Sequence, residues 1–243
     1  MARAAASPLL PKIRTALAKV GDPARAKQMQ AYMKSAMPYH GVPSAAMRAV
    51  ARDIFATYPF ADARSWRADV LAIWRGATHR EERYAALALV NHRKATPFND
   101  LDALPMYEDL IVSGAWWDYV DDLAGHRVGE LFAKHRKEMK KEMLAWSVDD
   151  DMWKRRTSIL CQMFLRSDTD LAFLYKCIEP SLPSKEFFLR KAIGWALRQV
   201  AWYDPDEVVR YVKAHDAELS GLSKREALKN VAKLQSGALK RRG

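Results

Sequence analysis

The stretch SKEFFLRKAIGWALRQVAWY, residues 184–203, decides the fold class. Its apolar residues recur every three to four positions, which places them on one face of a helix that turns about 100° per residue. This apolar stripe consists of Phe188, Leu189, Ala192, Ile193, Ala196, Leu197 and Val200. The stretch therefore predicts an amphipathic helix with one face buried in a core.

The rest of the 243-residue chain repeats this pattern, and its Gly and Pro residues fall between the periodic segments. Further helices are predicted near residues 8–20, 23–37, 44–57, 64–75, 79–93, 100–113, 115–123, 126–145, 149–166, 168–179, 205–215 and 223–235. No stretch alternates between apolar and polar residues, so no sheet is predicted. The sequence indicates an all-α fold.

Consecutive helices form pairs of about 35–40 residues, a spacing typical of HEAT-like repeats. Such repeats stack into a superhelical solenoid whose concave face is the usual binding surface. No linker or change in composition divides the chain. We therefore expect residues 1–243 to form a single domain.

The composition is that of a globular protein, with 49% hydrophobic and 28% charged residues. No apolar run approaches the roughly 18 residues needed to span a bilayer, and the N-terminus lacks a secretory signal. Cys161 and Cys177 are isolated from each other and from any His cluster, which favours two reduced core thiols. We expect a cytoplasmic protein without membrane contact that needs no metal and no organic cofactor.

The net charge of +11 favours a polyanionic partner. Residues 1–60 hold nine Lys and Arg against two Asp, and residues 181–243 hold thirteen against seven acidic residues. The middle of the chain is nearly neutral. Two basic ends suit a protein that grips a phosphate backbone, although a merely basic surface gives the same charge.

The face of the 184–203 helix opposite the apolar stripe carries Lys191, Trp195, Arg198 and Trp202. Two indoles among cations suit a platform for nucleic acid. They also suit packing of both Trp residues against the next helix, and the sequence leaves both interpretations open.

A second pattern is AWWDYVDD, residues 115–122, in which Trp117 and Asp121 are neighbours four residues apart on one helical face. An indole beside a carboxylate is more often structural than functional when it occurs alone. In a third pattern, DMWKRR at 151–156, Arg156 sits at the border of an apolar stripe. There it can reach a phosphate or pair with Asp121.

The strings WWDYVD, WKRRTSIL, PSKEFF, LRKAIGWALR and LSKREA occur in this order between residues 116 and 227. In order and spacing they resemble the alkylpurine DNA glycosylase family of HEAT-like repeats, the AlkD type of DNA alkylation repair enzyme. The resemblance runs from about residue 29 to residue 227. It implies a C-shaped solenoid with double-stranded DNA in its concave groove, acting as a monomer in the cytoplasm and on the nucleoid.

The resemblance also implies roles for individual residues. Asp121 matches the family's catalytic carboxylate. Trp117 and Trp195 match the two indoles that contact the damaged nucleotide, and Tyr32 matches a residue near the lesion strand. Arg156 and Arg198 match arginines of the DNA cleft, and Lys191 lies on the same cationic face as Arg198. Asp122 stands where the family more often has a smaller or apolar residue, and helical phase favours Asp121 over Asp122 because Asp121 shares a face with Trp117.

The implied activity is removal of N3- or N7-alkylated purines from duplex DNA. These bases carry a positive charge and leave readily, so a single Asp that stabilises the oxocarbenium-like sugar and positions water suffices. The family is understood to act without a base pocket. The main alternative is a non-catalytic HEAT-like protein that binds DNA or structured RNA, and a scaffold for an acidic peptide is a weaker one. A nuclease interpretation fails, because the sequence offers no convincing cluster of carboxylates or His residues that would bind the catalytic metal.

Overall fold

The computed structural model describes residues 8–240, and all regular structure in this range is helical. Its contacts group the chain into two compact units, Met1–Met106 and Tyr107–Gly243. In the described range, no helix is both long and apolar enough to cross a membrane. The single-domain organisation stays a prediction.

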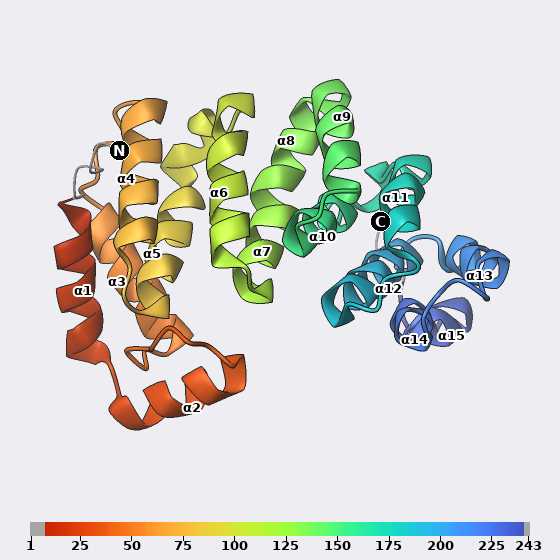
Figure 1. Cartoon of the computed structure of the whole chain (residues 1–243), viewed down its shortest axis with the longest axis horizontal. Helices are drawn as coiled ribbons and strands as arrows, with labels where there is room; N and C mark the ends of the chain where they lie inside the picture. The colour runs from red at the N-terminus through yellow and green to blue at the C-terminus, as the bar shows by residue number, and fades with distance from the viewer. Residues whose placement is uncertain (1–7, 241–243) are drawn as a thin grey trace. The chain divides into compact units, whose positions relative to one another are not determined.

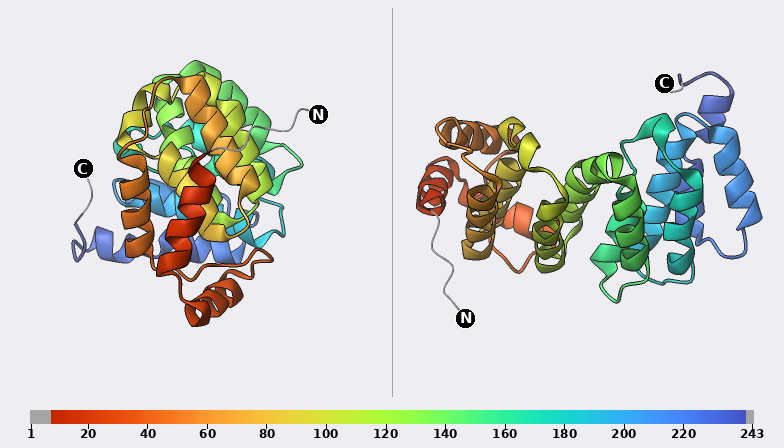
Figure 2. Two further views of the ribbon diagram at one scale, coloured as in Figure 1. Left: turned by 90° about the vertical axis from the view of Figure 1, so that its left-hand side faces the viewer. Right: turned by 90° about the horizontal axis from the view of Figure 1, so that it is seen from above.

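The first unit is built from five α-helices, followed by two short 3-10 helices. They are α1 (Leu9–Val20), α2 (Pro23–Met33), α3 (Ser44–Phe55), α4 (Ala63–Gly76), α5 (Arg80–Val90), η1 (Arg93–Phe98) and η2 (Leu101–Ala103). Helices α1, α3, α4 and α5 pack on one another, and their shared core includes Leu17, Phe55, Trp66 and Trp74. Helix α2 stands apart from this group, beyond the end of α1 (Figure 1; Figure 2, left).

Local signals explain the limits of α2. The carboxylate of Asp22 accepts hydrogen bonds from the backbone N–H groups of Ala24 and Arg25, and Pro23 occupies the first turn. Lys34 ends the helix in the left-handed conformation, with φ of 48°. The helix therefore stops short of the predicted residue 37, and of its residues only Met33 is buried.

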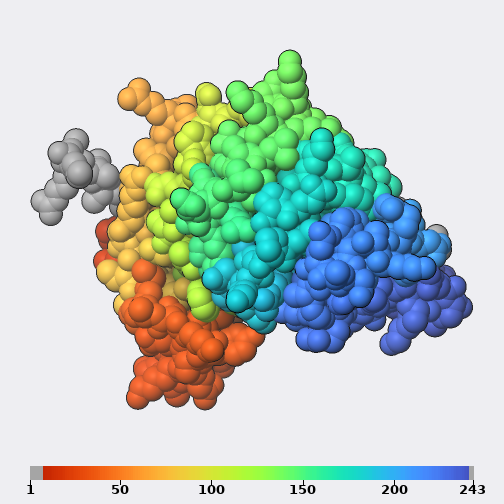
Figure 3. All heavy atoms as spheres, turned by 45° about the vertical axis from the view of Figure 1, so that its right-hand side comes forward, coloured from red at the N-terminus to blue at the C-terminus, as the bar shows by residue number. Residues whose placement is uncertain are grey.

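The second unit contains the remaining helices, which follow one another across it in chain order (Figures 1 and 3). They are α6 (Leu104–Gly114, which begins in the first unit), α7 (Trp117–Asp122), the π-helical segment η3 (Leu123–Val128), α8 (Gly129–Lys134), α9 (Arg136–Ser147), α10 (Met152–Leu160), η4 (Arg166–Asp168), α11 (Leu171–Ile178), η5 (Glu179–Ser181), α12 (Phe187–Ala201), α13 (Pro205–Ala214), α14 (Gly221–Leu228) and α15 (Val231–Gln235). Asp151 and Asp204 cap α10 and α13 with their carboxylates.

The predicted helix boundaries between residues 115 and 145 were wrong. Helices α7 and α8 form one continuous run through the π-helical segment, and the break comes at His135, with φ of −125° and ψ of 55°. Gly129 permits close packing here, since a Cβ on it would lie 2.8 Å from the carbonyl oxygen of Cys161. Gly129 therefore allows two helical segments to pack closely and does not mark the end of a helix.

The predicted helix 149–166 was too long, because α10 ends at Leu160 and a turn follows. The residues after Leu160 no longer follow the α-helical periodicity from which their burial was predicted. Phe164, which the helical phase assigns to the core, is 51% exposed as a result.

Candidate functional site

The carboxylate of Asp121, at the end of α7, forms a two-pronged ion pair with Arg156 of α10. Arg156 Nε donates to Asp121 Oδ1 at 2.7 Å and Nη2 donates to Oδ2 at 2.8 Å. The side chains are 3% exposed for Arg156 and 13% for Asp121. The sequence allowed Arg156 either a phosphate or Asp121 as its partner, and in the structure the partner is Asp121.

The third nitrogen of the Arg156 guanidinium, Nη1, donates to the backbone carbonyl oxygen of Phe188 on α12. The guanidinium carbon also lies 5.9 Å from the centre of the Phe188 ring. One buried side chain thus ties together α7, α10 and α12. Because all three nitrogens are engaged, Arg156 holds Asp121 in a fixed orientation.

Three aromatic rings pack against one another on these same elements. Trp116, the residue before α7, lies 6.2 Å from Trp153 of α10 and 5.4 Å from Phe188 of α12. Trp153 and Phe188 are 5.0 Å apart. This cluster fixes the spacing of the three helices that supply the ion pair.

Burial raises the pKa of Asp121 above its ordinary value. The hydrogen bonds and the charge of Arg156 oppose this rise, and the charge of Asp118 adds to it. The carboxylate is thus a poorly solvated anion with one cationic partner. In such surroundings its charge acts on a neighbouring group more strongly than it would in water.

The two predicted lesion-contacting indoles are both half-buried. Trp117 begins α7, one turn before Asp121. Trp195 lies on α12, where it and Trp202 pack against the core of the second unit. The prediction that Trp195 and Trp202 pack against the protein is therefore correct in part, since each of these two side chains still keeps some exposed surface.

Lys191 and Arg198 of α12 share one partner, Glu226 of α14. Lys191 Nζ lies 2.7 Å from Glu226 Oε1, and Arg198 Nη1 lies 2.6 Å from Glu226 Oε2. Lys191 is the more exposed of the two cations, with 37% of its side chain accessible against 19% for Arg198. One acidic group thus serves two cations, which leaves a net positive charge at this surface.

Tyr32 lies on α2 of the first unit, and 79% of its surface is exposed. A large exposed aromatic ring on a helix with little buried surface is available to a partner. Tyr32 and the ion pair of Asp121 belong to different compact units.

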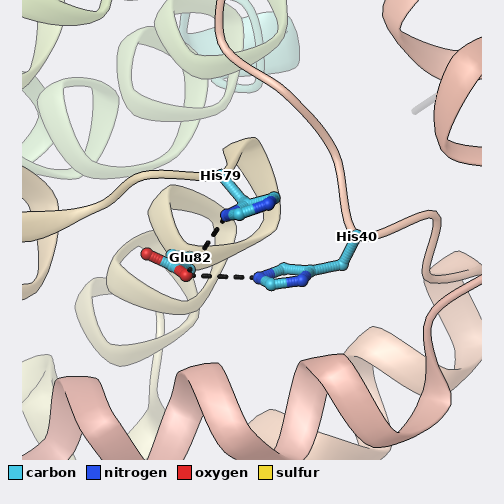
Figure 4. Close-up of side chains that lie close together, drawn as sticks. All are labelled: His40, His79 and Glu82. Carbon is cyan, nitrogen blue, oxygen red and sulfur yellow. Dashed lines mark hydrogen bonds and ion pairs between the residues drawn. The ribbon is translucent and has the colours of Figure 1, made fainter. Parts of the chain in front are cut away.

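A cluster of His40, His79 and Glu82 in the first unit has the ligand types of a metal site (Figure 4). Glu82 Oε1 lies 3.2 Å from His40 Nε2 and 3.7 Å from His79 Nδ1, and the two imidazole rings stack at 3.9 Å. Arg14, however, donates to both Glu82 oxygens at 2.9 Å. Its charge would repel a divalent ion, so we interpret the group as a hydrogen-bonded cluster.

Glu82 is fully buried in this cluster. Burial alone would raise its pKa, but hydrogen bonds from Arg14, the Thr78 N–H and His40 outweigh this effect and lower the pKa to about 2. The neighbouring Glu81 accepts hydrogen bonds from the backbone N–H groups of residues 40–42. The two carboxylates therefore anchor the loop between α2 and α3 onto α5.

Sequence reasoning missed two partners of the predicted residues. The carbonyl oxygen of Phe188 leaves no mark in a sequence, because every residue has one. Glu226 had a signal, since it lies within the string LSKREA, but its partners are 35 and 28 residues away on another helix. Gly194 explains that pairing, because a Cβ on it would lie 2.5 Å from Glu226 Cβ and 2.7 Å from the carbonyl oxygen of Ser223.

Comparisons with known proteins agree with this arrangement. The family model for DNA alkylation repair enzymes matches residues 13–231. The solved structure of a predicted DNA alkylation repair enzyme from Enterococcus faecalis has a TM-score of 0.79 and 28% sequence identity, covering 88% of this chain and 97% of that one. No curated protein matches the sequence.

These matches confirm the predicted family and the predicted fold class of helical repeats. The family acts on alkylated DNA, which makes DNA the substrate and an enzymatic role the expectation for this chain. The strings from WWDYVD to LSKREA all fall inside the matched range. The chain belongs to the family of DNA alkylation repair enzymes.

Proposed function

We propose that this protein is a DNA glycosylase that hydrolyses the N-glycosidic bond of N3- or N7-alkylated purines in duplex DNA. The proposal rests on one observation above the others. The carboxylate of Asp121 is largely desolvated, is held in place by an ion pair with Arg156, and lies one helical turn from Trp117. This is a fixed negative charge beside an aromatic side chain, in a family that acts on alkylated DNA.

The chemistry needs little more than that charge. An alkylated purine is already cationic, so the bond between its nitrogen and C1′ of the sugar breaks with both electrons going to the base, which leaves neutral. Positive charge then develops on the deoxyribose, where a carboxylate stabilises it. Water adds to C1′, and its proton passes to Asp121 or to solvent.

Each oxygen of Asp121 accepts one hydrogen bond from Arg156 and keeps a second lone-pair direction. Asp121 can therefore act on sugar or water while its pair with Arg156 stays intact. The pair also favours Asp121 over Asp122 as the acting carboxylate. Arg156 is a positioning residue in this proposal.

The other predicted residues bind DNA in this proposal. The indoles of Trp117 and Trp195 attract the cationic nucleotide through their ring faces, each by about 0.5–2 kcal/mol. Tyr32 contacts the lesion strand. Lys191 and Arg198 contact phosphates with the charge that Glu226 leaves uncompensated. A single copy of the chain supplies all of these groups.

The decisive experiment incubates the protein with methylated duplex DNA and analyses the free bases released. Asp121→Asn keeps the shape of the side chain but removes its charge, so we expect release to fall about 10²–10³-fold, the usual effect of losing one preorganised electrostatic group. DNA affinity should stay level or rise, since an anion opposes binding of a polyanion. Asp122→Asn is the matched control and should retain its activity.

Two outcomes would contradict the proposal. Full activity in both Asp variants would mean that neither carboxylate takes part. Efficient release of uracil, a neutral base, from duplex DNA would mean that charge on the base is not what activates the leaving group.

A second candidate is a binding protein without catalysis, and one observation favours it. The two-pronged contact of Arg156 compensates much of the charge of Asp121. A wild-type protein that binds methylated duplex tightly and releases no base would establish this alternative.

A further inference from the structure

A hollow of about 570 Å³ lies in the second unit, on helical segments that continue those of the candidate site. This volume is within the range of ligand pockets, about 300–1,000 Å³. Its walls come from the π-helical segment, α8, the turn after α10 and the end of α12. The lining residues used below are Gly125, His126, Phe164, Arg166 and Gln199.

The hollow adjoins the site on two helices. Gly125 follows Asp121 by four residues along the continuous α7–α8 run, and Gln199 follows Trp195 by four residues along α12. Four residues are about one helical turn, or about 6 Å of rise. A nucleotide bound in the hollow would therefore be a close neighbour of the one that Asp121 acts on.

The hollow has an aromatic wall. The ring of Phe164 is half exposed and stacks on the imidazole of His126 at 4.7 Å, with the planes 28° apart. Gly125 makes this position possible, because a Cβ on it would lie 2.5 Å from the Phe164 ring. An exposed Phe is costly in water, and here the local packing holds it at the rim of a cavity.

Polar groups without partners complete the lining. Within residues 8–240, the side-chain amide of Gln199 makes no hydrogen bond, and the guanidinium of Arg166 makes neither an ion pair nor a hydrogen bond. Arg166 is also in the left-handed conformation, with φ of 55°, which a residue with a side chain rarely adopts.

We propose that this hollow binds one unpaired nucleotide of the bound DNA, which is a neighbour of the alkylated nucleotide and not the alkylated nucleotide itself. The base stacks on the Phe164–His126 pair, the amide of Gln199 bonds to the base edge, and Arg166 contacts the adjoining phosphate. An aromatic platform, an amide and a guanidinium are the groups that proteins use on unstacked nucleotides. The inference rests on the DNA binding in the proposed function but needs no catalysis by Asp121.

The test compares two unmodified duplexes, one fully paired and one with a single bulged adenine. We expect the wild type to bind the bulged duplex more tightly. Phe164→Ala should weaken binding of the bulged duplex about ten-fold, because base–aromatic stacking contributes about one such factor or more. It should change the affinity for the paired duplex less than two-fold, and Phe164→Tyr, which keeps the ring, should retain the preference.

A matched pair of variants tests the phosphate contact. Arg166→Ala should reduce the affinity for the bulged duplex, whereas Lys141→Ala, which removes an exposed cation from α9 outside the hollow, should not. The inference is wrong if the wild type shows no preference for the bulge, or if Phe164→Ala weakens both duplexes equally. A bulge preference that depends on Phe164 in a protein that releases no base would uphold the inference and reject only the glycosylase.

Discussion

At the scale of single residues, the pair of Asp121 and Arg156 is both a structural and a chemical unit. Removing one partner of a buried ion pair leaves the other charge uncompensated, which commonly costs about 3–5 kcal/mol. Effects on activity must therefore be separated from effects on folding. A pH profile does this, because loss of folded protein lowers the whole curve, while a change in the pKa of Asp121 moves it sideways.

We expect excision to fall on the acidic side as Asp121 becomes protonated, because only the ionised form stabilises the sugar cation. Burial raises its pKa, so the fall should begin above the pH at which an exposed Asp titrates. In Arg156→Gln the hydrogen bonds and charge that lower this pKa are lost, and the acidic limb should move to higher pH. Single-turnover excision measured against pH, corrected for spontaneous base loss, checks this.

Arg198→Gln is the control for this shift, because Arg198 contacts Glu226 and makes no ion pair with Asp121. Its acidic limb should coincide with that of the wild type. An unmoved limb in Arg156→Gln, with the protein folded by circular dichroism, would show that Asp121 is not the ionising group.

Much of the site could be predicted at this scale, because residue type and helical phase are properties of the sequence. The helical periodicity of residues 115–122 placed Asp121 on the same face as Trp117. In the next pattern, Arg156 lies at the border of an apolar stripe, where its side chain can reach a carboxylate. The lining of the hollow could not be predicted, because Phe164 lies beyond the end of α10, where phase stops applying.

At the scale of elements, helices α12 and α14 meet at a close contact that only glycine permits. The backbone of Ser223 and the Cβ of Glu226 occupy the space where a side chain of Gly194 would lie. Ser223 Oγ also donates to the carbonyl oxygen of Arg190, one turn earlier on α12. This contact brings Glu226 between Lys191 and Arg198.

We expect Gly194→Ala to destabilise the protein, because the added carbon overpacks a contact made largely of backbone. Overpacking typically costs about 1–3 kcal/mol, and the better helix propensity of Ala offsets about 1 kcal/mol of that. The atoms in the way are the Cβ of Glu226 and the backbone of Ser223, which cannot swing aside, so the cost should lie in the upper part of that range. Urea unfolding should then show a net loss of about 1–2 kcal/mol. Gly221→Ala is the matched control, since its Cβ would meet only the flexible end of Arg225 at 3.3 Å.

Equal stability of the Gly194→Ala variant and the wild type would mean that α12 and α14 separate without cost. The contact would then not be what aligns Glu226 with its two cations.

The elements themselves were largely predictable, since apolar periodicity marks most helices and caps such as Asp204-Pro205 mark the start of several. The boundaries between residues 115 and 145 were not. No Gly or Pro marks the break at His135, while Gly125 and Gly129 lie inside a continuous helical run. Glycine in this protein signals close packing at those positions, and a single sequence does not distinguish packing from a break.

At the scale of the whole molecule, the net charge of +11 overstates the number of cations free to meet phosphates. Arg14 is paired with Glu82, Arg156 with Asp121, and Lys191 and Arg198 share Glu226. The sequence predicted a basic protein correctly and allowed the pair of Arg156 with Asp121. It could not assign the other pairs, because each joins residues at least 28 positions apart.

Binding of undamaged duplex should therefore weaken linearly on a plot of log affinity against log salt concentration. For six to ten phosphate contacts, affinity falls about 10³–10⁵-fold between 50 and 200 mM salt. Lys191→Ala and Arg198→Ala should each lower the slope by about 0.9, the effect of one lost phosphate contact. Arg156→Gln should leave the slope unchanged, because the three nitrogens of this guanidinium are already engaged inside the protein. Fluorescence anisotropy titrations at four or five salt concentrations measure all four slopes. A lower slope in Arg156→Gln alone would place the phosphates at Asp121 and away from the exposed face of α12.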